Sequence, residues 1–279
     1  MNSKLKIKRG AAKIVALAIA LSSFAPAFAA DDEDNTGLWT SIELSKKVTK
    51  KFKIGGEAEF RTNDYLKEVE RFSVGINGQY KINNWLKASA GHIFIFGYNP
   101  ESTKIHFDEN GDEDGFNCDK AYWEKRNRVH ISLSGEYKIG RVQLSLRERL
   151  QYTRTHAEIV DEEKHRFTTQ RNDAGEWVEK WATPRTEPET KEHKNNTVLR
   201  SRLTAKWDIA KCKVSPFAST ELYSRINGWD SFEKLRSRVG ASYKIDKDNA
   251  IEVYYLFEKA GEKGKANTHA IGIGYSLDL

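Results

Sequence analysis

The stretch FKIGGEAEFR at residues 52–61 alternates apolar or small residues with polar ones at every second position. The stretch FSVGINGQYKI at residues 72–82 repeats this alternation. Successive side chains of a β-strand point to opposite faces, so a period of two predicts strands with one apolar and one polar face. Runs of about 10 to 14 residues are twice the usual length of a soluble strand, and they fit the roughly 9–11 residues that a tilted strand needs to cross a bilayer. The alternation therefore predicts membrane-spanning strands.

The same pattern continues along the chain and predicts eleven strands, at roughly 38–48, 52–62, 70–82, 85–98, 125–139, 141–155, 197–209, 212–225, 234–246, 249–258 and 268–279. Short polar links alternate with long ones, as in barrels with short periplasmic turns and longer extracellular loops. We expect the two longest links, 99–124 and 156–195, to be external loops, with a small hairpin around 172–175 in the second. Bacterial single-chain barrels normally have an even number of strands. The prediction is therefore a transmembrane antiparallel β-barrel of about 10–12 strands, with a further strand around 31–37 left open.

Four strands end in an aromatic, a polar and an aliphatic residue before a short link. The aromatic residues are Tyr80, Tyr137, Trp207 and Tyr243. Amphipathic rings at one level are typical of the aromatic girdle at a membrane interface. The alternative is a soluble β-sandwich or a lipocalin-type barrel, whose apolar faces would point inward.

The first 29 residues have the three parts of a secretory signal: a basic start, an apolar run at 14–24, and Ala27 and Ala29 before the expected cut. The whole chain has a formal charge of +6, but five basic residues and no acid lie in this leader, so the remaining chain has 41 basic against 40 acidic side chains. That balance argues against a nucleic-acid partner. We therefore expect a cleaved signal peptide at 1–29, one barrel domain at 30–279, and a location in the outer membrane of a Gram-negative bacterium.

Several short motifs resemble an outer-membrane barrel family that is catalogued as domain of unknown function 2490. They are Trp39, the run 57–61 (EAEFR), Arg147-Glu148-Arg149, Arg200-Ser201-Arg202, Pro216-Phe217, Glu221-Leu222-Tyr223, and Arg236-Ser237-Arg238 with Tyr243. The resemblance covers nearly the whole chain after the leader. It implies an outer-membrane β-barrel and implies no activity.

Arginine on the polar strand faces is the most distinctive chemical feature. The residues expected to line the lumen are Arg126, Arg128, Arg147, Arg149, Arg200, Arg202, Arg236, Arg238, Glu57, Glu59 and Glu221. One hypothesis is a narrow passive pore that prefers anions, since arginine-lined constrictions select them. The alternative is a structural or surface-binding barrel whose lumen is filled by ion pairs.

A third hypothesis is an acyl hydrolase that modifies lipid. His130 and Ser132 share one strand face, a spacing similar to the catalytic pair of outer-membrane phospholipase and lipid A deacylase barrels, with His130 as base and Ser132 as nucleophile. No Asn-Gly follows Ser132, and parity places the pair in the lumen, away from lipid. The prediction is therefore that the protein is not an enzyme.

The loop at 99–124 contains part of a calcium-loop pattern. Asn110, Asp112 and Asp114 occupy ligand positions, but Ala121 stands where the pattern needs a bidentate Glu. We expect a solvated acidic loop, no bound metal and no cofactor. The expected partners are outer-membrane lipid, lipopolysaccharide and the barrel-assembly machinery, with the oligomeric state left open.

Overall fold

A computed structural model describes residues 34–279 except 173, 175, 227–231 and 262–265. The leader predicted at 1–29 lies outside the described residues. The described chain is built of β-strands, with one short 3₁₀ turn, η1 (Asp64–Leu66). Within these residues, no helix has the length and apolar character needed to span a membrane.

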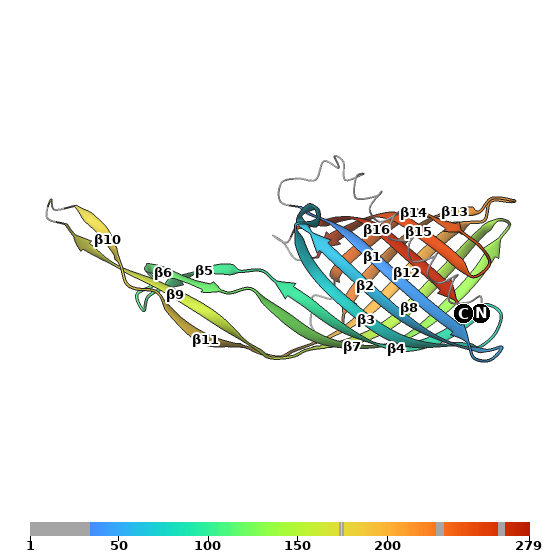
Figure 1. Ribbon diagram of the computed structural model, residues 1–279, viewed down its shortest axis with the longest axis horizontal. Helices are drawn as coiled ribbons and strands as arrows, with labels where there is room; N and C mark the ends of the chain where they lie inside the picture. Colours follow the sequence, from blue (N-terminus) through green and yellow to red (C-terminus); the bar gives the residue numbers. More distant parts are fainter. Residues whose placement is uncertain (1–33, 173, 175, 227–231, 262–265) are drawn as a thin grey trace, which may run out of the picture. The chain divides into compact units, whose positions relative to one another are not determined.

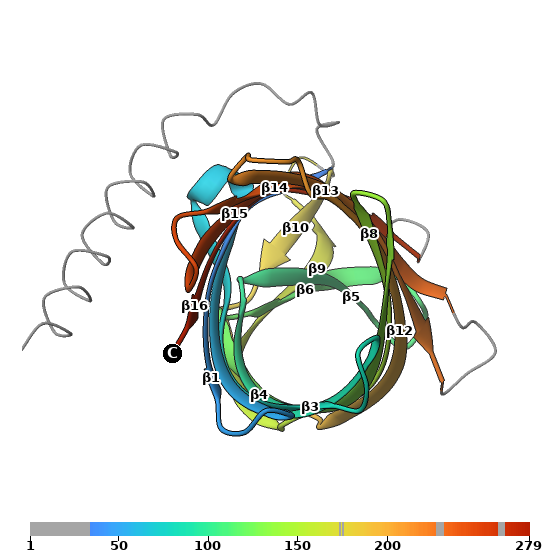
Figure 2. The ribbon, with the colours of Figure 1, turned by 90° about the vertical axis from the view of Figure 1, so that its right-hand side faces the viewer.

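Eleven strands close into a barrel (Figures 1 and 2). They are β1 (Asn35–Lys47), β2 (Phe52–Asn63), β3 (Glu68–Lys81), β4 (Leu86–Asn99), β7 (Tyr122–Ile139), β8 (Val142–Thr155), β12 (Lys194–Trp207), β13 (Val214–Arg225), β14 (Phe232–Lys244), β15 (Asn249–Ala260) and β16 (Thr268–Asp278). Each strand pairs antiparallel with the next along the barrel, and β1 closes the ring by pairing parallel with β16, from Asn35 opposite Thr268 to Ser45 opposite Asp278.

The predicted strands are confirmed, and each of their ends lies within three residues of the observed end. No twelfth strand was missed at the start of the described barrel, because residues 35–37 belong to β1. An up-and-down chain with an odd number of strands has its first and last strands running in the same direction. The parallel β1–β16 pair is the geometric consequence of that odd number.

The outer face of the barrel is apolar. Ile76, Ile131 and Val239 are 71, 60 and 58 % exposed, whereas their polar neighbours along each strand point inward. The four predicted girdle rings, Tyr80, Tyr137, Trp207 and Tyr243, are 44–70 % exposed at the ends of strands that enter short turns. An apolar outside around a polar inside is the pattern of an outer-membrane β-barrel, and it excludes a soluble barrel with inward apolar faces.

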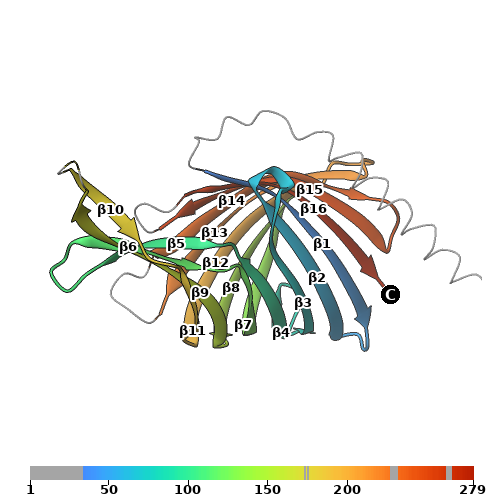
Figure 3. The same cartoon turned by 60° about the vertical axis from the view of Figure 1, so that its left-hand side comes forward.

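The two long links that were expected to be loops instead form a second sheet (Figure 3). Its strands are β5 (Ser102–Phe107), β6 (Glu113–Asp119), β9 (Glu158–Arg171), β10 (Trp177–Trp181) and β11 (Arg185–Lys191). The predicted hairpin is confirmed, since Arg171 pairs with Trp177 across the turn between β9 and β10. The remaining strands escaped prediction because much of this sheet is polar on both faces, so little period-two signal marks them.

Candidate functional site

The barrel encloses a cavity of about 680 Å³. All eleven barrel strands contribute to its lining, because every second side chain of each strand points inward. Among the lining residues that the structure describes, eleven are lysine or arginine and five are aspartate or glutamate. The interior is therefore polar and predominantly cationic.

One carboxylate in the wall faces three guanidinium groups, a set we call the Glu221 cluster: Glu221, Arg147, Arg200 and Arg202. Arg147 and Arg202 each donate a hydrogen bond of 2.7 Å to Glu221, and Arg200 donates two of 3.1 Å. Glu221 is 2 % exposed. These residues come together because β8, β12 and β13 are neighbours and Arg147, Arg202 and Glu221 lie at one register level. One negative charge against three positive ones leaves a surplus of positive charge on this wall.

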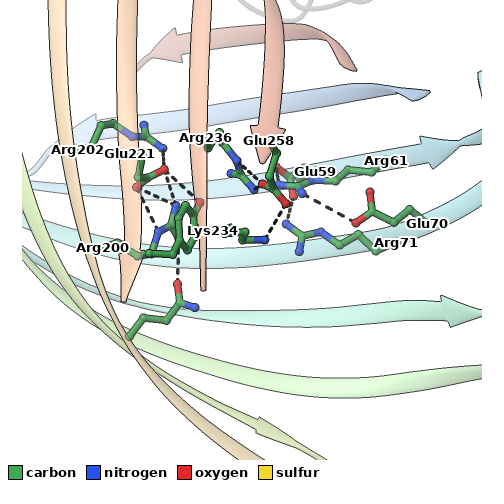
Figure 4. Close-up of polar contacts among 12 residues, drawn as sticks. Glu59, Arg61, Glu70, Arg71, Arg200, Arg202, Glu221, Lys234, Arg236 and Glu258 are labelled. Atoms are coloured by element: carbon green, nitrogen blue, oxygen red, sulfur yellow. Dashed lines mark hydrogen bonds and ion pairs between the residues drawn. The ribbon is translucent and has the colours of Figure 1, made fainter. Parts of the chain in front are cut away.

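Two further carboxylates each accept hydrogen bonds from two cations (Figure 4). Glu258 on β15 accepts hydrogen bonds from Lys234 at 2.9 Å and from Arg236 at 2.7 Å. Glu59 on β2 accepts hydrogen bonds from Arg61 at 2.9 Å and Arg71 at 2.6 Å. Ion pairs in a confined interior are screened less than surface pairs, so they rigidify the wall.

Aromatic rings stack on the same arginines. The guanidinium of Arg61 lies 3.4 Å from the ring centre of Trp39, and that of Arg236 lies 4.7 Å from it. Tyr223 lies 4.5 Å from the guanidinium of Arg200. Trp39 is 4 % exposed and packs on Leu256 and the rest of a small apolar group on the inner wall. The rings narrow the interior at this level.

Three arginines are held in a different way, and we call them the hydroxyl-anchored arginines: Arg128, Arg149 and Arg238. Their Nε groups donate to the hydroxyls of Thr153 at 3.1 Å, Ser132 at 3.0 Å and Ser219 at 3.2 Å, respectively. Each hydroxyl belongs to the residue directly opposite on the neighbouring strand. Within the described part of the chain, none of the three arginines forms an ion pair with a carboxylate.

The structure places most of the predicted lumen residues around the cavity. Those on its lining are Arg128, Arg147, Arg149, Arg200, Arg202, Arg236, Arg238, Glu57 and Glu59. Glu221 lies in the wall behind its three arginines. Arg126 is not on the lining, and its Nε pairs with Glu124 near the start of β7.

Trp39, Tyr223 and Lys234 were missing from the predicted set, although they lie on the cavity lining. The alternation of side chains along each strand would have been enough to predict that they face the lumen. Tyr223 is two residues from Glu221, and Lys234 is two residues from Arg236, so each shares a strand face with a predicted lumen residue.

His130 and Ser132 lie inside the barrel and are 6 and 5 % exposed. Ser132 Oγ accepts its hydrogen bond from Arg149, and the described contacts include none between the two residues. The imidazole Nδ1 of His130 is buried and has no partner among the described residues. The geometry thus places the pair away from lipid and does not align it for acyl transfer.

The calcium-loop residues do not converge on a point. Asn110 and Asp112 lie in the turn after β5, where their backbone N–H groups donate to Asp108. Asp114 instead contacts His106, with 2.6 Å between Oδ1 and Nδ1.

A different carboxylate group, Asp119, Glu162 and Glu189, has oxygens within 4.8 Å of one another in the second sheet. Lys104 and Lys191 donate to Asp119 at 3.0 and 2.8 Å. Burial acts to raise the pKa of Asp119, but the hydrogen bonds from Lys191 and Lys104 outweigh it and lower the pKa. The lysines already balance much of the negative charge that a cation would need.

A family model described as "Protein of unknown function (DUF2490)" matches residues 36–268. A comparison with curated proteins gives no match. A structure of the NanC porin is similar at 14% identity, covering 88% of this chain and 98% of that chain with a TM-score of 0.44. The translocator domain of the autotransporter NalP from Neisseria meningitidis is similar at 14% identity, covering 99% of each chain with a TM-score of 0.28.

Proposed function

We propose, for a chain that belongs to this family of proteins of unknown function, that the barrel is a narrow passive pore in the outer membrane with a preference for anions. The observation that carries the proposal is the enclosed cavity, whose lining has eleven cationic and five acidic side chains. Charge of one sign in a confined aqueous path concentrates ions of the opposite sign and excludes those of the same sign.

The outside of the barrel supports a place in the outer membrane. Apolar residues such as Ile76 and Ile131 face outward without a protein partner among the described residues, and a bilayer is the environment that would cover them. A closed barrel also leaves no unpaired strand edge in the hydrocarbon, as a spanning structure requires. On this proposal the short turns are periplasmic and the second sheet is external.

The rings at the level of Trp39 favour a narrow pore over a wide one. Trp39, Arg61 and Arg236 are each no more than 8 % exposed, so their groups crowd this part of the interior. A lumen filled at this level would make the protein a structural or surface-binding barrel, which is the alternative that the experiment separates. The hydrolase hypothesis is not retained, because no contact of His130 or Ser132 supports it.

The test is single-channel recording of the refolded protein in a planar bilayer under a salt gradient. We expect small, reproducible conductance steps and a reversal potential displaced toward the chloride equilibrium potential. Folded barrels that insert without conducting would show a filled lumen, and a reversal potential on the cation side would contradict the anion preference.

A further inference from the structure

The interior arginines fall into two classes that differ in what holds them. Arg147, Arg200 and Arg202 share Glu221, Arg236 pairs with Glu258, and Arg61 and Arg71 share Glu59. The hydroxyl-anchored arginines, Arg128, Arg149 and Arg238, have a serine or threonine in place of a carboxylate. Each arginine of the first class contacts a carboxylate, which it shares with other cations, whereas the described carboxylates contact none of the second class.

We propose that the hydroxyl-anchored arginines are binding stations for phosphate groups along the inner wall, an inference that rests on the barrel admitting anions as proposed above. In each of them the Nε group is occupied by a hydroxyl, and no described residue accepts a hydrogen bond from the terminal nitrogens of Arg128, Arg149 or Arg238. A guanidinium in this state is oriented by its Nε and offers its two terminal nitrogens to a planar pair of oxygens.

Local charge favours a doubly charged oxyanion over a singly charged one. The single carboxylate of Glu221 faces three guanidinium groups, and the charge of one of them, Arg202, acts on both Arg149 and Arg238. Besides Glu221, two carboxylates act electrostatically on these arginines: Glu57 acts on Arg149, and Glu252 acts on Arg238. Neither forms an ion pair with those arginines among the described residues. A phosphate dianion balances the surplus charge, whereas a monocarboxylate leaves part of it.

The β7–β8 wall holds another polar group between two stations. On β7, Arg128, His130 and Ser132 share the inward face, and His130 is buried with an unpartnered Nδ1. Arg128 lies opposite Thr153 and Arg149 lies opposite Ser132. The two levels are four residues apart on β7, about 13 Å along a strand. The arrangement is therefore a row of separate contacts that a phosphate can visit in turn.

The experiment is calorimetric titration of the refolded barrel in detergent at about pH 8, where phosphate is mainly doubly charged. The probes are inorganic phosphate, glycerol phosphate and acetate. We expect saturable binding of inorganic phosphate and weaker binding of acetate. Equal binding of glycerol phosphate would identify phosphate esters as ligands, and binding of inorganic phosphate alone would identify the free ion. Acetate bound as tightly as phosphate would overturn the proposal.

Matched variants test which arginines bind. Arg149→Gln removes a hydroxyl-anchored guanidinium, and Arg236→Gln removes the same charge from an arginine paired with a carboxylate, where Lys234 remains on Glu258. A hydrogen bond to a charged group contributes about 1.5–3 kcal/mol, so Arg149→Gln should weaken phosphate binding at least about tenfold. Arg236→Gln should change it less than about threefold. Arg149→Lys keeps the positive charge but lacks the planar pair of terminal nitrogens. Its phosphate affinity should lie between those of the other two variants.

Circular dichroism and gel mobility before and after heating establish that each variant is folded. Absence of saturable phosphate binding by the folded wild-type barrel would overturn the inference. So would a loss in Arg236→Gln equal to that in Arg149→Gln. A barrel that binds phosphate and does not conduct would refute the pore alone, and one that conducts anions without binding phosphate would refute the stations alone.

Discussion

The barrel and the five-stranded sheet are both built of charged, strand-rich sequence, but they treat charge differently. In the barrel, Glu221 is 2 % exposed and faces three arginines. In the sheet, Lys164 pairs with Glu187, whose side chain is 52 % exposed. The barrel closes on itself, whereas the sheet is a single layer whose strands β5, β10 and β11 each pair with one neighbour.

Closure is the cause of the difference. A closed barrel confines its inner side chains in a narrow space, where charges are poorly screened and an unbalanced one has a high free energy. A single layer in water leaves most of its charged side chains solvated, so most of its ion pairs are screened and contribute little. Charge in the barrel interior therefore controls stability and, on the proposed function, ion passage, while most charge in the sheet controls neither.

The largest expected effect is on the Glu221 cluster. Glu221→Gln leaves three guanidinium groups without their counter-charge, and removing one partner of a buried pair costs about 3–5 kcal/mol. We expect a loss of that size in the free energy of unfolding, measured by urea titration of the barrel in lipid vesicles. Glu57→Gln is the control, because Glu57 lines the cavity without an ion pair among the described residues. Equal losses in the two variants would contradict the account.

The next largest effect is expected on the width of the barrel lumen. A Cβ atom on Gly272 would lie 1.9 Å from Cζ of Tyr254, which lines the cavity. Gly272→Val therefore forces the ring away from the wall, at a cost of about 1–3 kcal/mol, and we expect a smaller single-channel conductance. The control is Gly135→Val on β7, where a Cβ meets nothing within 4 Å. Unchanged conductance in a folded Gly272→Val barrel would refute this placement of Tyr254.

A smaller effect is expected in the sheet at acid pH. The lysines lower the pKa of Asp119 from its ordinary value of 3.8, so the stability contributed by this carboxylate is fully present above pH 3.8 and is lost as the pH falls toward the lowered pKa. Lys191 has its pKa raised, after burial has acted against it, by Asp119 and Glu189, so its contribution is present at neutral pH. We expect the amide protection of β6 and β9 to fall on acidification below pH 3.8, measured by hydrogen exchange corrected for intrinsic rates.

The matched control for that measurement is Asp161→Asn, since Asp161 is an exposed carboxylate on β9, the strand that pairs with β6. The variant Asp119→Asn should remove the acid transition, and Asp161→Asn should leave it in place. A transition that survives in Asp119→Asn would assign the acid sensitivity to another group.

The smallest effect is expected at the surface pair of the sheet. Glu187→Gln removes the contact with Lys164, which joins Nζ to Oε2 at 2.6 Å between two solvated strands. Both side chains are solvated whether or not they are in contact. We therefore expect no measurable change in the amide protection of β9 or β11. A clear loss would show that charge in the sheet is as important as charge in the barrel.

The barrel could be predicted from sequence because its environment imposes a strict pattern. An apolar outer face and a polar inner face require alternation along every strand, and this is visible from Phe52 to Arg61 and from Phe72 to Ile82. Several strands of the sheet have no clear difference in polarity between their two faces, so the sequence pattern predicted loops at β6 and β11. The observed eleven strands lie within the predicted range of 10–12, whose parity was left open. The parallel β1–β16 pairing follows from the odd number and was not predicted.

For the interior, the alternation of side chains along each strand predicted that most of these arginines face the lumen. It could not tell which ones are paired, because pairing depends on register between strands far apart in the chain. Arg149 and Arg200 are directly opposite in the β8–β12 ladder, but only Arg200 reaches Glu221 across β12 and β13. Only the structure could therefore distinguish the arginines that contact a carboxylate from the hydroxyl-anchored arginines.

The most direct test of the account is the reversal potential under a salt gradient for the wild-type barrel and for the variant Arg128→Gln, Arg149→Gln and Arg238→Gln combined. The account predicts an anion-selective wild type and a triple variant whose reversal potential moves toward zero. The double variant Arg147→Gln and Arg202→Gln should shift the reversal potential less for each charge removed. A wild type without anion selectivity, or a triple variant that retains all of it, would contradict the claim that the hydroxyl-anchored arginines carry the anion path.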